Sequence, residues 1–517
     1  MKRKYKVYIN NQHVEREVNI IPGRYILAML LTILETIAVI GVVIAACIYI
    51  PYFYIACYLT VVGVIIAIIC SNDNPDYKIP WILAVLLIPI AGFMFYFLFY
   101  KRKLSKRYVK RIKDVKDSLL YDDKNNLKEL KENNKLIYSQ ALELTKISDS
   151  KVYKNTHITY FPSGEAYMEN MLYDLKNAKE FILFEYFIVE NGLFWDSILN
   201  ILKEKAKEGI IVKVMWDDIG CISTLPGNYY KELRKFGIDA YPFSRLKGQA
   251  DSEFNNRNHR KILVVDGKVG YTGGINIADE YINHVERFGH WKDMGIRLEG
   301  EAVNELSKLF LTDFYSNSKN EFNSVYYRNY SVDSKSYVIP FGDGPKPIYN
   351  ENVGKIVIMN MLNQATDYVY ITTPYLIIDA ELLNAIKNTS LRGVDVRIIV
   401  PHIPDKKIVF EMTKSNYKVL IDAGVKIYEY KPGFIHGKLY ISDDKLAMIG
   451  TINLDYRSLV HHFENGVWIY NDEVVLDMKE DYLDTINKSI EININSIKDK
   501  LINKIIRILV KIFSPLL

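Results

Sequence analysis

Residues 258–276 read N-H-R-K-I-L-V-V-D-G-K-V-G-Y-T-G-G-I-N, and residues 435–453 read I-H-G-K-L-Y-I-S-D-D-K-L-A-M-I-G-T-I-N. Each matching residue of the second stretch lies 177 positions after its counterpart in the first (436 − 259, 453 − 276). One H-x-K-x4-D pattern is a weak signal, but two copies in one register are hard to obtain by chance. We interpret them as a duplicated unit that consists of His259, Lys261, Asp266, Gly273 and Asn276 in the first copy and of His436, Lys438, Asp443, Gly450 and Asn453 in the second.

Each copy predicts a β-hairpin. In the first copy the apolar runs 262–265 and 269–272 flank Asp266-Gly267, a dipeptide typical of two-residue turns. Asp266 lies at this turn and has the opposite strand parity to His259. We therefore expect Asp266 to hold the hairpin rather than to contact a substrate.

The predicted hairpin brings polar groups to one place. Centring the turn on residues 266 and 267 puts His259 opposite Gly274 and Lys261 opposite Thr272. Side chains two residues apart on a strand point to the same face. An imidazole, an ammonium and a bare glycine backbone therefore meet there, with Asn276 just beyond, and this set suits a tetrahedral oxyanion.

The chain around the hairpins predicts an α/β fold. Apolar, strand-type runs at 181–187 and 209–217 are separated by a helical stretch, and the later runs 368–375 and 393–400 repeat this order. Strands that alternate with helices indicate α/β layers.

Apolar stretches at about 25–47, 50–70 and 80–100 precede the repeats. Each is close to the roughly 20 residues of one membrane crossing, so we expect a multi-pass transmembrane region. The first stretches together are too long for a secretory signal. A basic, polar tail precedes them at 1–24, and a basic helical linker follows at 101–150.

The membrane side is less constrained. Positive charges crowd residues 101–113, which favours a cytoplasmic catalytic part. The tail is basic as well, and three full crossings cannot place both ends on one side. Either residues 25–70 do not cross the membrane twice, or one of the two basic clusters departs from the rule that positive charges lie on the cytoplasmic side. Residues 496–517 predict a basic amphipathic helix, for which core packing and membrane-surface contact are both open.

Metal and disulfide sites are not expected. The chain has four cysteines with no C-x2-C spacing. His461, His462 and Glu464 are ligand-type residues, but adjacent residues on a strand face opposite ways. There is no H-E-x-x-H and no phosphate-binding G-x4-G-K-[ST].

The paired motifs resemble those of the phospholipase D superfamily, whose members join two such halves around one phosphodiester-cleaving site. Residues 271–281, 291–293 and 373–375, residues 81–83 with Pro89, and the terminal 514–517 are similar to bacterial cardiolipin synthases. The resemblance implies two phospholipase D-like α/β halves, at 151–330 and 331–495, related by a pseudo-twofold axis. It also implies a bacterial cell membrane as the location.

The resemblance further implies the transfer of a phosphatidyl group from one phosphatidylglycerol to another, which yields cardiolipin and glycerol. One histidine forms a covalent phosphohistidine and the other acts as acid and then base. By resemblance His259 is the nucleophile, although the sequence is nearly symmetric. Glu464 resembles the acidic partner of the opposite histidine. Lys261, Lys438 and the expected phosphate-binding residues would meet the phosphate charge without a metal; the latter are Asn276, Asn453, Gly273, Gly274, Gly450 and Thr451.

Other acceptors remain open. Water would make the protein a phospholipase D-type hydrolase, serine would make it a phosphatidylserine synthase, and a membrane scaffold could keep the fold without turnover. A nuclease would gain little from apolar spans, so the expected partners are phosphatidylglycerol and anionic lipids rather than nucleic acid. The donor lipid, which could also be phosphatidylethanolamine, and the oligomeric state are left open.

Overall fold

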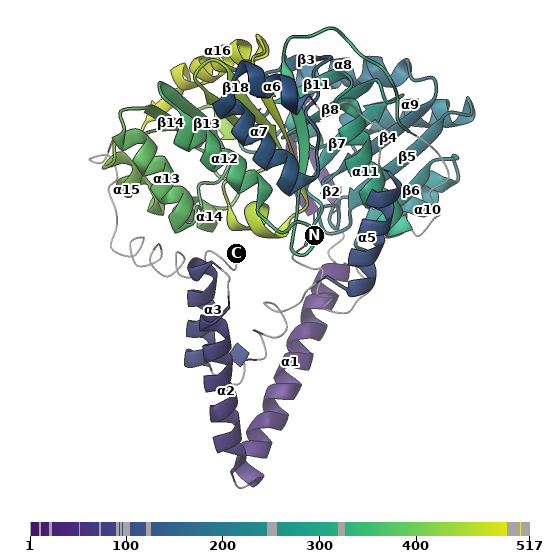
Figure 1. Cartoon of the computed structure of the whole chain (residues 1–517). Helices are drawn as coiled ribbons and strands as arrows, with labels where there is room; N and C mark the ends of the chain where they lie inside the picture. The colour runs from purple at the N-terminus through teal and green to yellow at the C-terminus, as the bar shows by residue number, and fades with distance from the viewer. Residues whose placement is uncertain are drawn as a thin grey trace.

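The computed structural model describes residues 2–9, 12–19, 23–50, 52–71, 74–88, 92–93, 96, 104–119, 126–245, 256–318, 326–493 and 507 (Figure 1). Two mixed β-sheets and the helices that flank them form the body of the molecule. This is the α/β arrangement that the alternation of strands and helices predicts.

The first sheet has seven strands in the order β3-β11-β8-β7-β4-β5-β6. β4, β5 and β6 are parallel, whereas β7, β8, β11 and β3 pair antiparallel. Its elements are β3 (Thr156–Phe161), α8 (Gly164–Lys176), β4 (Phe181–Tyr186), α9 (Leu193–Lys207), β5 (Ile211–Asp217), α10 (Tyr229–Arg234), β6 (Asp239–Phe243), β7 (Lys261–Val265), β8 (Val269–Gly273) and β11 (Gly295–Gly300).

The second sheet repeats this order as β12-β19-β18-β17-β13-β14-β15, with β20 added at its edge. Its elements are β12 (Tyr337–Asp343), α12 (Val353–Gln364), β13 (Tyr368–Thr372), α13 (Ala380–Leu391), β14 (Asp395–Pro401), α14 (Lys407–Ser415), α15 (Tyr417–Ile421), β15 (Lys426–Tyr430), β17 (Leu439–Ser442), β18 (Leu446–Gly450), β19 (Glu464–Tyr470), α16 (Val474–Asn487) and β20 (Ser489–Glu491).

The core between the sheets follows strand parity. Ile262 and Val264 of β7 share one apolar cluster with Leu439 and Ile441 of β17 and with α11 (Val303–Ser318). The alternate residues of β7 pack instead with α8 and α9, and those of the second sheet pack with α12 and α13. Each sheet is therefore covered by helices on one face, and its second face packs in the core that the two halves share with α11.

The hairpins form, but the expected register is wrong by one residue. Leu263 pairs with Tyr271 and Val265 with Val269, so the turn has three residues and the pairs expected for His259 and Lys261 are shifted. Asp266 and Gly267 adopt φ values of 55° and 66°. The N–H of Lys268 then donates to the carbonyl of Val265 at 3.1 Å, which closes a longer loop than the dipeptide alone predicts.

The turn aspartates bind backbone. The Asp266 carboxylate accepts the N–H groups of Lys179, Glu180 and Phe181 at 2.7–3.2 Å. Asp443 accepts those of residues 366–368 at 2.9–3.1 Å in the same way. Each aspartate thus ties its hairpin to the start of the neighbouring strand.

The two halves exchange backbone hydrogen bonds. β10 (His290–Lys292) of the first half pairs in parallel with β16 (Gly433–Ile435), which leads to the second motif. Asn258, just before the first motif, forms a parallel bridge with Phe463 of the second half. Each histidine is therefore fixed in part by the opposite half.

Within the expected linker, the described residues form α5 (Lys106–Ser118), α6 (Leu127–Asn133) and α7 (Lys135–Ser148). They pack on the body: buried Ile112 of α5 joins the core between the sheets, and Leu144 of α7 joins the core behind the second sheet. At the start of the chain, β1 (Lys2–Ile9) and β2 (Gln12–Asn19) form a hairpin that pairs with β9 (Val285–Glu286).

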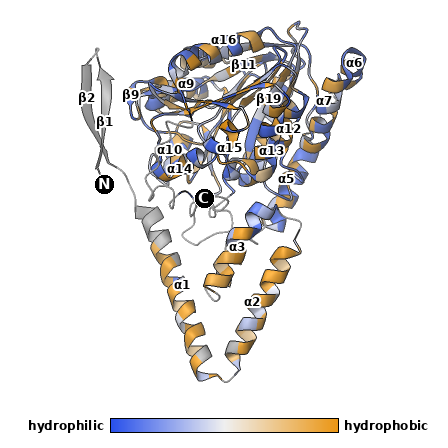
Figure 2. Cartoon of the chain, turned by 90° about the vertical axis from the view of Figure 1, so that its left-hand side faces the viewer, coloured by the Kyte–Doolittle hydropathy of each residue, from blue (hydrophilic) through white to orange (hydrophobic). Residues whose placement is uncertain are grey.

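Helices α1 (Gly23–Tyr49) and α2 (Phe53–Ile69) project from the body and are largely apolar, and α3 (Pro75–Leu87) returns beside α2 (Figures 1 and 2). Among the described residues, no helix combines the length and apolar character that a bilayer crossing requires. The expected spans at about 25–47, 50–70 and 80–100 are therefore not supported. α2 has 17 residues and α3 has 13, fewer than the roughly 20 of a crossing.

Two expectations fall outside the described residues. The first is the end of the third expected span, because most of residues 89–100 lie outside the described part of the chain. The amphipathic helix expected at 496–517 is described only at Arg507, whose Nε donates to Glu411 at 2.8 Å.

Candidate functional site

His259 is held by a carboxylate of the opposite half. Its Nδ1 lies 2.9 Å from Oε2 of Glu464, and its backbone N–H donates to the carbonyl of Phe463 at 2.8 Å. Glu464 is the first residue of β19 and is fully buried. Because Nδ1 is engaged, Nε2 is the nitrogen left to react.

His436 is held in the reciprocal way. Its Nδ1 lies 2.7 Å from Oδ2 of Asp293, and its backbone N–H donates to the carbonyl of Lys292 at 2.7 Å. The buried Asp293 belongs to the first half. Each half therefore supplies one histidine and the acid that orients the other histidine.

The two motifs also approach each other directly. A Cβ placed on Gly274 would lie 3.1 Å from the carbonyl oxygen of His436. The amide of Asn465 donates to Thr272 Oγ1 across the halves at 2.8 Å. The structure thus brings the first and second motifs together at one buried interface.

The lysines fold back onto their own motifs. Lys261 Nζ donates to the carbonyl of His259 at 2.9 Å, and Lys438 Nζ donates to the carbonyl of His436. Burial, together with repulsion from Lys438, lowers the pKa of Lys261 to about 7. Burial also lowers the pKa of Lys438 to about 8, although Asp293 opposes the shift. An incoming phosphate would favour the charged form of both lysines.

Burial keeps both histidines neutral. It lowers the pKa of His259 to about 3 against the attraction of Glu464. It lowers that of His436 to about 4, with a further contribution from the Lys438 ammonium. Burial of Glu464 opposes its ionisation, yet His259 and His462 hold its pKa below the usual range. The site therefore offers neutral imidazoles beside ionised carboxylates.

Several of the expected phosphate-binding residues lie at points of close packing. Gly273 and Gly450 allow close strand approach, since a Cβ would lie 2.5 Å from the Gly295 Cα in the first case and 2.4 Å from the Asn465 carbonyl in the second. At Gly274 a Cβ would lie 2.1 Å from Oδ1 of Asp293.

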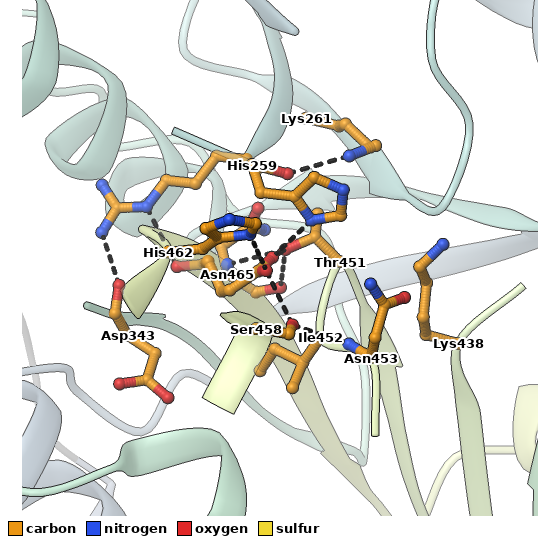
Figure 3. A network of polar contacts seen from close by, with 12 residues as sticks. His259, Lys261, Asp343, Lys438, Thr451, Ile452, Asn453, Ser458, His462 and Asn465 are labelled. Atoms are coloured by element: carbon orange, nitrogen blue, oxygen red, sulfur yellow. Dashed lines mark hydrogen bonds and ion pairs between the residues drawn. The ribbon is translucent and has the colours of Figure 1, made fainter. Parts of the chain in front are cut away.

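Thr451, the counterpart of Gly274, donates through Oγ1 to Glu464 Oε2 at 2.5 Å, and Ser458 Oγ donates to the other carboxylate oxygen at 2.7 Å. Figure 3 shows His259, Thr451 and Ser458 gathered around one place, and each of the three is hydrogen-bonded to this carboxylate. Glu464 is thus more fully hydrogen-bonded than a sequence motif alone indicates.

The two asparagines are not equivalent. Asn276 accepts the N–H of Ile188 at 3.1 Å and donates to the Tyr281 hydroxyl at 2.7 Å. Asn453 is buried, and its Oδ1 has no hydrogen-bond partner among the described residues. An amide can present either its N–H2 or its oxygen after a flip. Of the pair, Asn453 is the better placed to meet a substrate oxygen.

Arg260, between the two motif residues, points away from them. Its Nε donates to the carbonyl of Glu464 at 3.0 Å, and its Nη1 pairs with Asp313 at 2.6 Å. The side chain is fully buried. It therefore supports the backbone that carries the His259 acid.

His461 and His462 point to different neighbours, although His461 ends the π-helical turn Arg457–His461 and neither residue lies on the expected strand. His461 turns to Tyr77, whereas the His462 ring lies 5.6 Å from that of His259 and its Nδ1 lies 3.6 Å from Glu464. The ligand atoms of His259, His462 and Glu464 lie within 4.8 Å of one another, so this group could hold a metal ion.

Sequence reasoning missed Asp293, Ser458 and Arg260. Asp293 follows its own histidine by 34 residues (293 − 259), but Glu464 follows His436 by 28 (464 − 436). The repeat that aligns the motifs therefore does not align the acids. The hydroxyl of Ser458 and the direction of Arg260 have no motif signal.

Comparison with known proteins identifies the family. The model of the cardiolipin synthase, PLD-like domain matches residues 171–312 and 358–485. A phospholipase D-nuclease N-terminal model matches residues 59–99. The first match covers both histidine motifs and both orienting acids.

A Streptococcus mutans protein is 43% identical over 88% of this chain and 100% of its own length. A cardiolipin synthase of Alkalihalophilus pseudofirmus is 34% identical over 89% of this chain and 92% of its own. The fold is similar to a phosphatidylserine synthase of Haemophilus influenzae, with a TM-score of 0.56 and 18% identity over 74% of this chain and 98% of that one. The chain belongs to the cardiolipin synthase family of phospholipase D-like enzymes.

Proposed function

We propose that the protein transfers a phosphatidyl group from one phosphatidylglycerol to the free glycerol hydroxyl of a second, which yields cardiolipin and glycerol. The reciprocal exchange of acids, Glu464 to His259 and Asp293 to His436, is the observation that carries the proposal. It supports two oriented imidazoles at one phosphate. Family membership supports the lipid substrate.

In the first step, neutral His259 attacks phosphorus through Nε2 while Nδ1 stays on Glu464. The bond from phosphorus to the glycerol oxygen breaks, and His436 gives that oxygen a proton. His436 is neutral in the free protein. The negative charge of a bound phosphodiester raises its affinity for the proton that this step needs.

In the second step, the hydroxyl of another phosphatidylglycerol gives its proton to His436 and attacks phosphorus. The phosphorus–nitrogen bond breaks, and His259 is restored. Lys261, Lys438 and Asn453 offer donors to the non-bridging oxygens throughout. Donors of this kind are typically worth about 3 kcal/mol each to a transition state.

The proposed site of action is a membrane. α1 and α2 expose apolar side chains, for example Val42 (69%) of α1 and Leu59 (64%) of α2 (Figure 2). Exposed apolar surface of this extent marks a protein or membrane contact. α5 turns Lys106, Lys110 and Lys113 outward, which suits anionic headgroups. Multi-pass insertion and a cytoplasmic catalytic side remain predictions from the sequence.

The direct test uses the purified full chain in detergent with labelled phosphatidylglycerol and EDTA. We expect cardiolipin and glycerol. Phosphatidic acid alone would indicate a hydrolase, and phosphatidylserine formed on addition of serine would indicate the other transferase. Activity lost to EDTA and restored by a divalent cation would indicate a required metal ion, for which His259, His462 and Glu464 are the candidate ligands.

Replacement of either histidine tests the shared site. We expect His259→Ala and His436→Ala each to lower kcat by about three or more orders of magnitude, on the scale seen when a nucleophile or its base is removed. If labelled lipid becomes trapped on the protein in one variant but not in the other, the result would also show which of the two histidines is the nucleophile. Full turnover in either variant would exclude the mechanism.

A further inference from the structure

The amino-terminal end of α3 is docked head to head on that of α13. Asn74 caps α3 by accepting the N–H of Asp76 at 2.9 Å and donates to Asp379 at 2.8 Å. Asp379 caps α13 by accepting the N–H of Leu382 at 3.0 Å, and Asp76 accepts that of Ala380 at 2.8 Å. Two helix N-termini repel each other, and these carboxylates offset the repulsion.

The same end of α3 contacts the chain that leads to Glu464. The buried ring of Tyr77 packs edge-on against Tyr456 and His461, with ring centroids 5.8 and 5.4 Å apart. The Tyr77 hydroxyl is hydrogen-bonded to Nε2 of His461. The hydroxyl of Tyr456 donates to Asp76 at 3.3 Å.

Tyr456 and His461 stand at the two ends of one turn. The π-helical turn Arg457–His461 carries Ser458, whose Oγ donates to Glu464 at 2.7 Å and accepts the N–H of Asn453 at 2.8 Å. The turn continues into His462 and Glu464. α3 therefore holds both ends of the segment that fixes the acid of His259.

We propose that docking of α3 positions the Arg457–His461 turn and, through Ser458 and Glu464, the imidazole of His259. Tyr77 is then a positioning residue for catalysis, although it lies in the amino-terminal helical region. α3 follows α2 after a short connection and packs beside it. The apolar helices and the site are thus mechanically linked. This inference rests on the proposed catalytic role of His259.

The test is Tyr77→Phe, which keeps the ring and removes the hydroxyl. The full chain is assayed in detergent as phosphatidylglycerol consumed, so the result does not depend on which acceptor is used. We expect kcat to fall about fivefold to tenfold, which is the scale of one lost hydrogen bond, while KM stays within about twofold. The pH dependence of kcat shifts as well, because the Glu464–His259 pair is less well aligned.

Tyr173→Phe on the exposed face of α8 is the matched control and should leave both constants unchanged; its side chain is 69% exposed. Thermal unfolding of both variants checks the fold. A kcat for Tyr77→Phe equal to that of Tyr173→Phe overturns the inference.

A second pair covers the case in which Tyr77→Phe unfolds early. Asp76→Asn keeps an acceptor for Ala380 and Tyr456 and should retain most of kcat, whereas Asp76→Ala should lose it. Wild-type kcat in Asp76→Ala would overturn the coupling. A wild-type chain that consumes phosphatidylglycerol without forming cardiolipin would refute the proposed function alone, and one that consumes none would refute both.

Discussion

At the scale of single residues, the site depends on carboxylates that the motifs do not contain. Asp293 and Glu464 each orient the histidine of the opposite half. A buried carboxylate must be hydrogen-bonded to stay ionised. Thr451 and Ser458 meet this need for Glu464, and the space at Gly274 admits Asp293.

Gly274→Ala should therefore displace Asp293, since the new Cβ would lie 2.1 Å from its Oδ1. His436 would lose its Nδ1 partner, and we expect kcat to fall about 10²-fold, as for a weakened general acid. Steady-state assays of kcat and KM measure the effect. Thr451→Ser keeps the hydroxyl that serves Glu464 and should remain active. Equal activity of Gly274→Ala and wild type would contradict the packing argument.

At the scale of elements, each hairpin is tied to the adjacent strand by its turn aspartate. The two copies differ in environment, because Asp266 is buried whereas Asp443 is only partly so. A hydrogen bond to a charged group is worth more when water is excluded. The hairpin repeat therefore offers a matched pair of substitutions.

Asp266→Asn should lower the free energy of unfolding by about 1–3 kcal/mol, because it weakens the hydrogen bonds that the buried Asp266 carboxylate accepts from three backbone N–H groups. Asp443→Asn should cost less. Denaturant titrations of the two variants measure the difference, and the kcat of each should stay close to wild type once folded. A larger loss from Asp443→Asn would show that the burial argument is wrong.

The strands also show which parts of the fold sequence patterns can predict and which they cannot. Continuous apolar, strand-type runs predicted β4, β5, β7 and β8 and their repeats, because burial on both faces leaves few polar positions. The hairpin register was wrong by one, because Lys268 joins the turn. Turn length depends on backbone closure, which a dipeptide preference does not decide.

At the scale of the whole molecule, burial of neutral histidines sets the response to acid. The pKa values of His259, His436 and His461 fall to about 3, 4 and 3 because burial penalises the charged form. Between about pH 4 and 6.5 the unfolded chain binds more protons than the folded one. Stability is complete above that window and decreases as the pH falls through it.

Each such histidine should contribute about 2 kcal/mol to the loss of stability between pH 7 and pH 5. His461→Asn should lose less stability than the wild type between these two pH values, because it removes a buried imidazole that the folded chain keeps neutral. Denaturant midpoints at the two pH values make the comparison. An unchanged pH dependence in His461→Asn would mean that His461 titrates normally in the folded protein.

The sequence by itself determined the α/β class, the duplicated histidine and lysine motifs, the family and the acid at Glu464. The α/β class and the motifs follow from local apolar runs and from a repeat of constant spacing, whereas the family and the role of Glu464 follow from the resemblance of the motifs and their surroundings to known enzymes. Only the tertiary structure decided that Asp293 serves His436, that Thr451 and Ser458 serve Glu464, and that Tyr77 reaches His461. Asp293 and His436, and Tyr77 and His461, are far apart in the chain and share no register, so these contacts exist only once the chain has folded and its parts pack together. Thr451 and Ser458 are close to Glu464 in sequence, but the turn that directs their hydroxyls to it carries no motif.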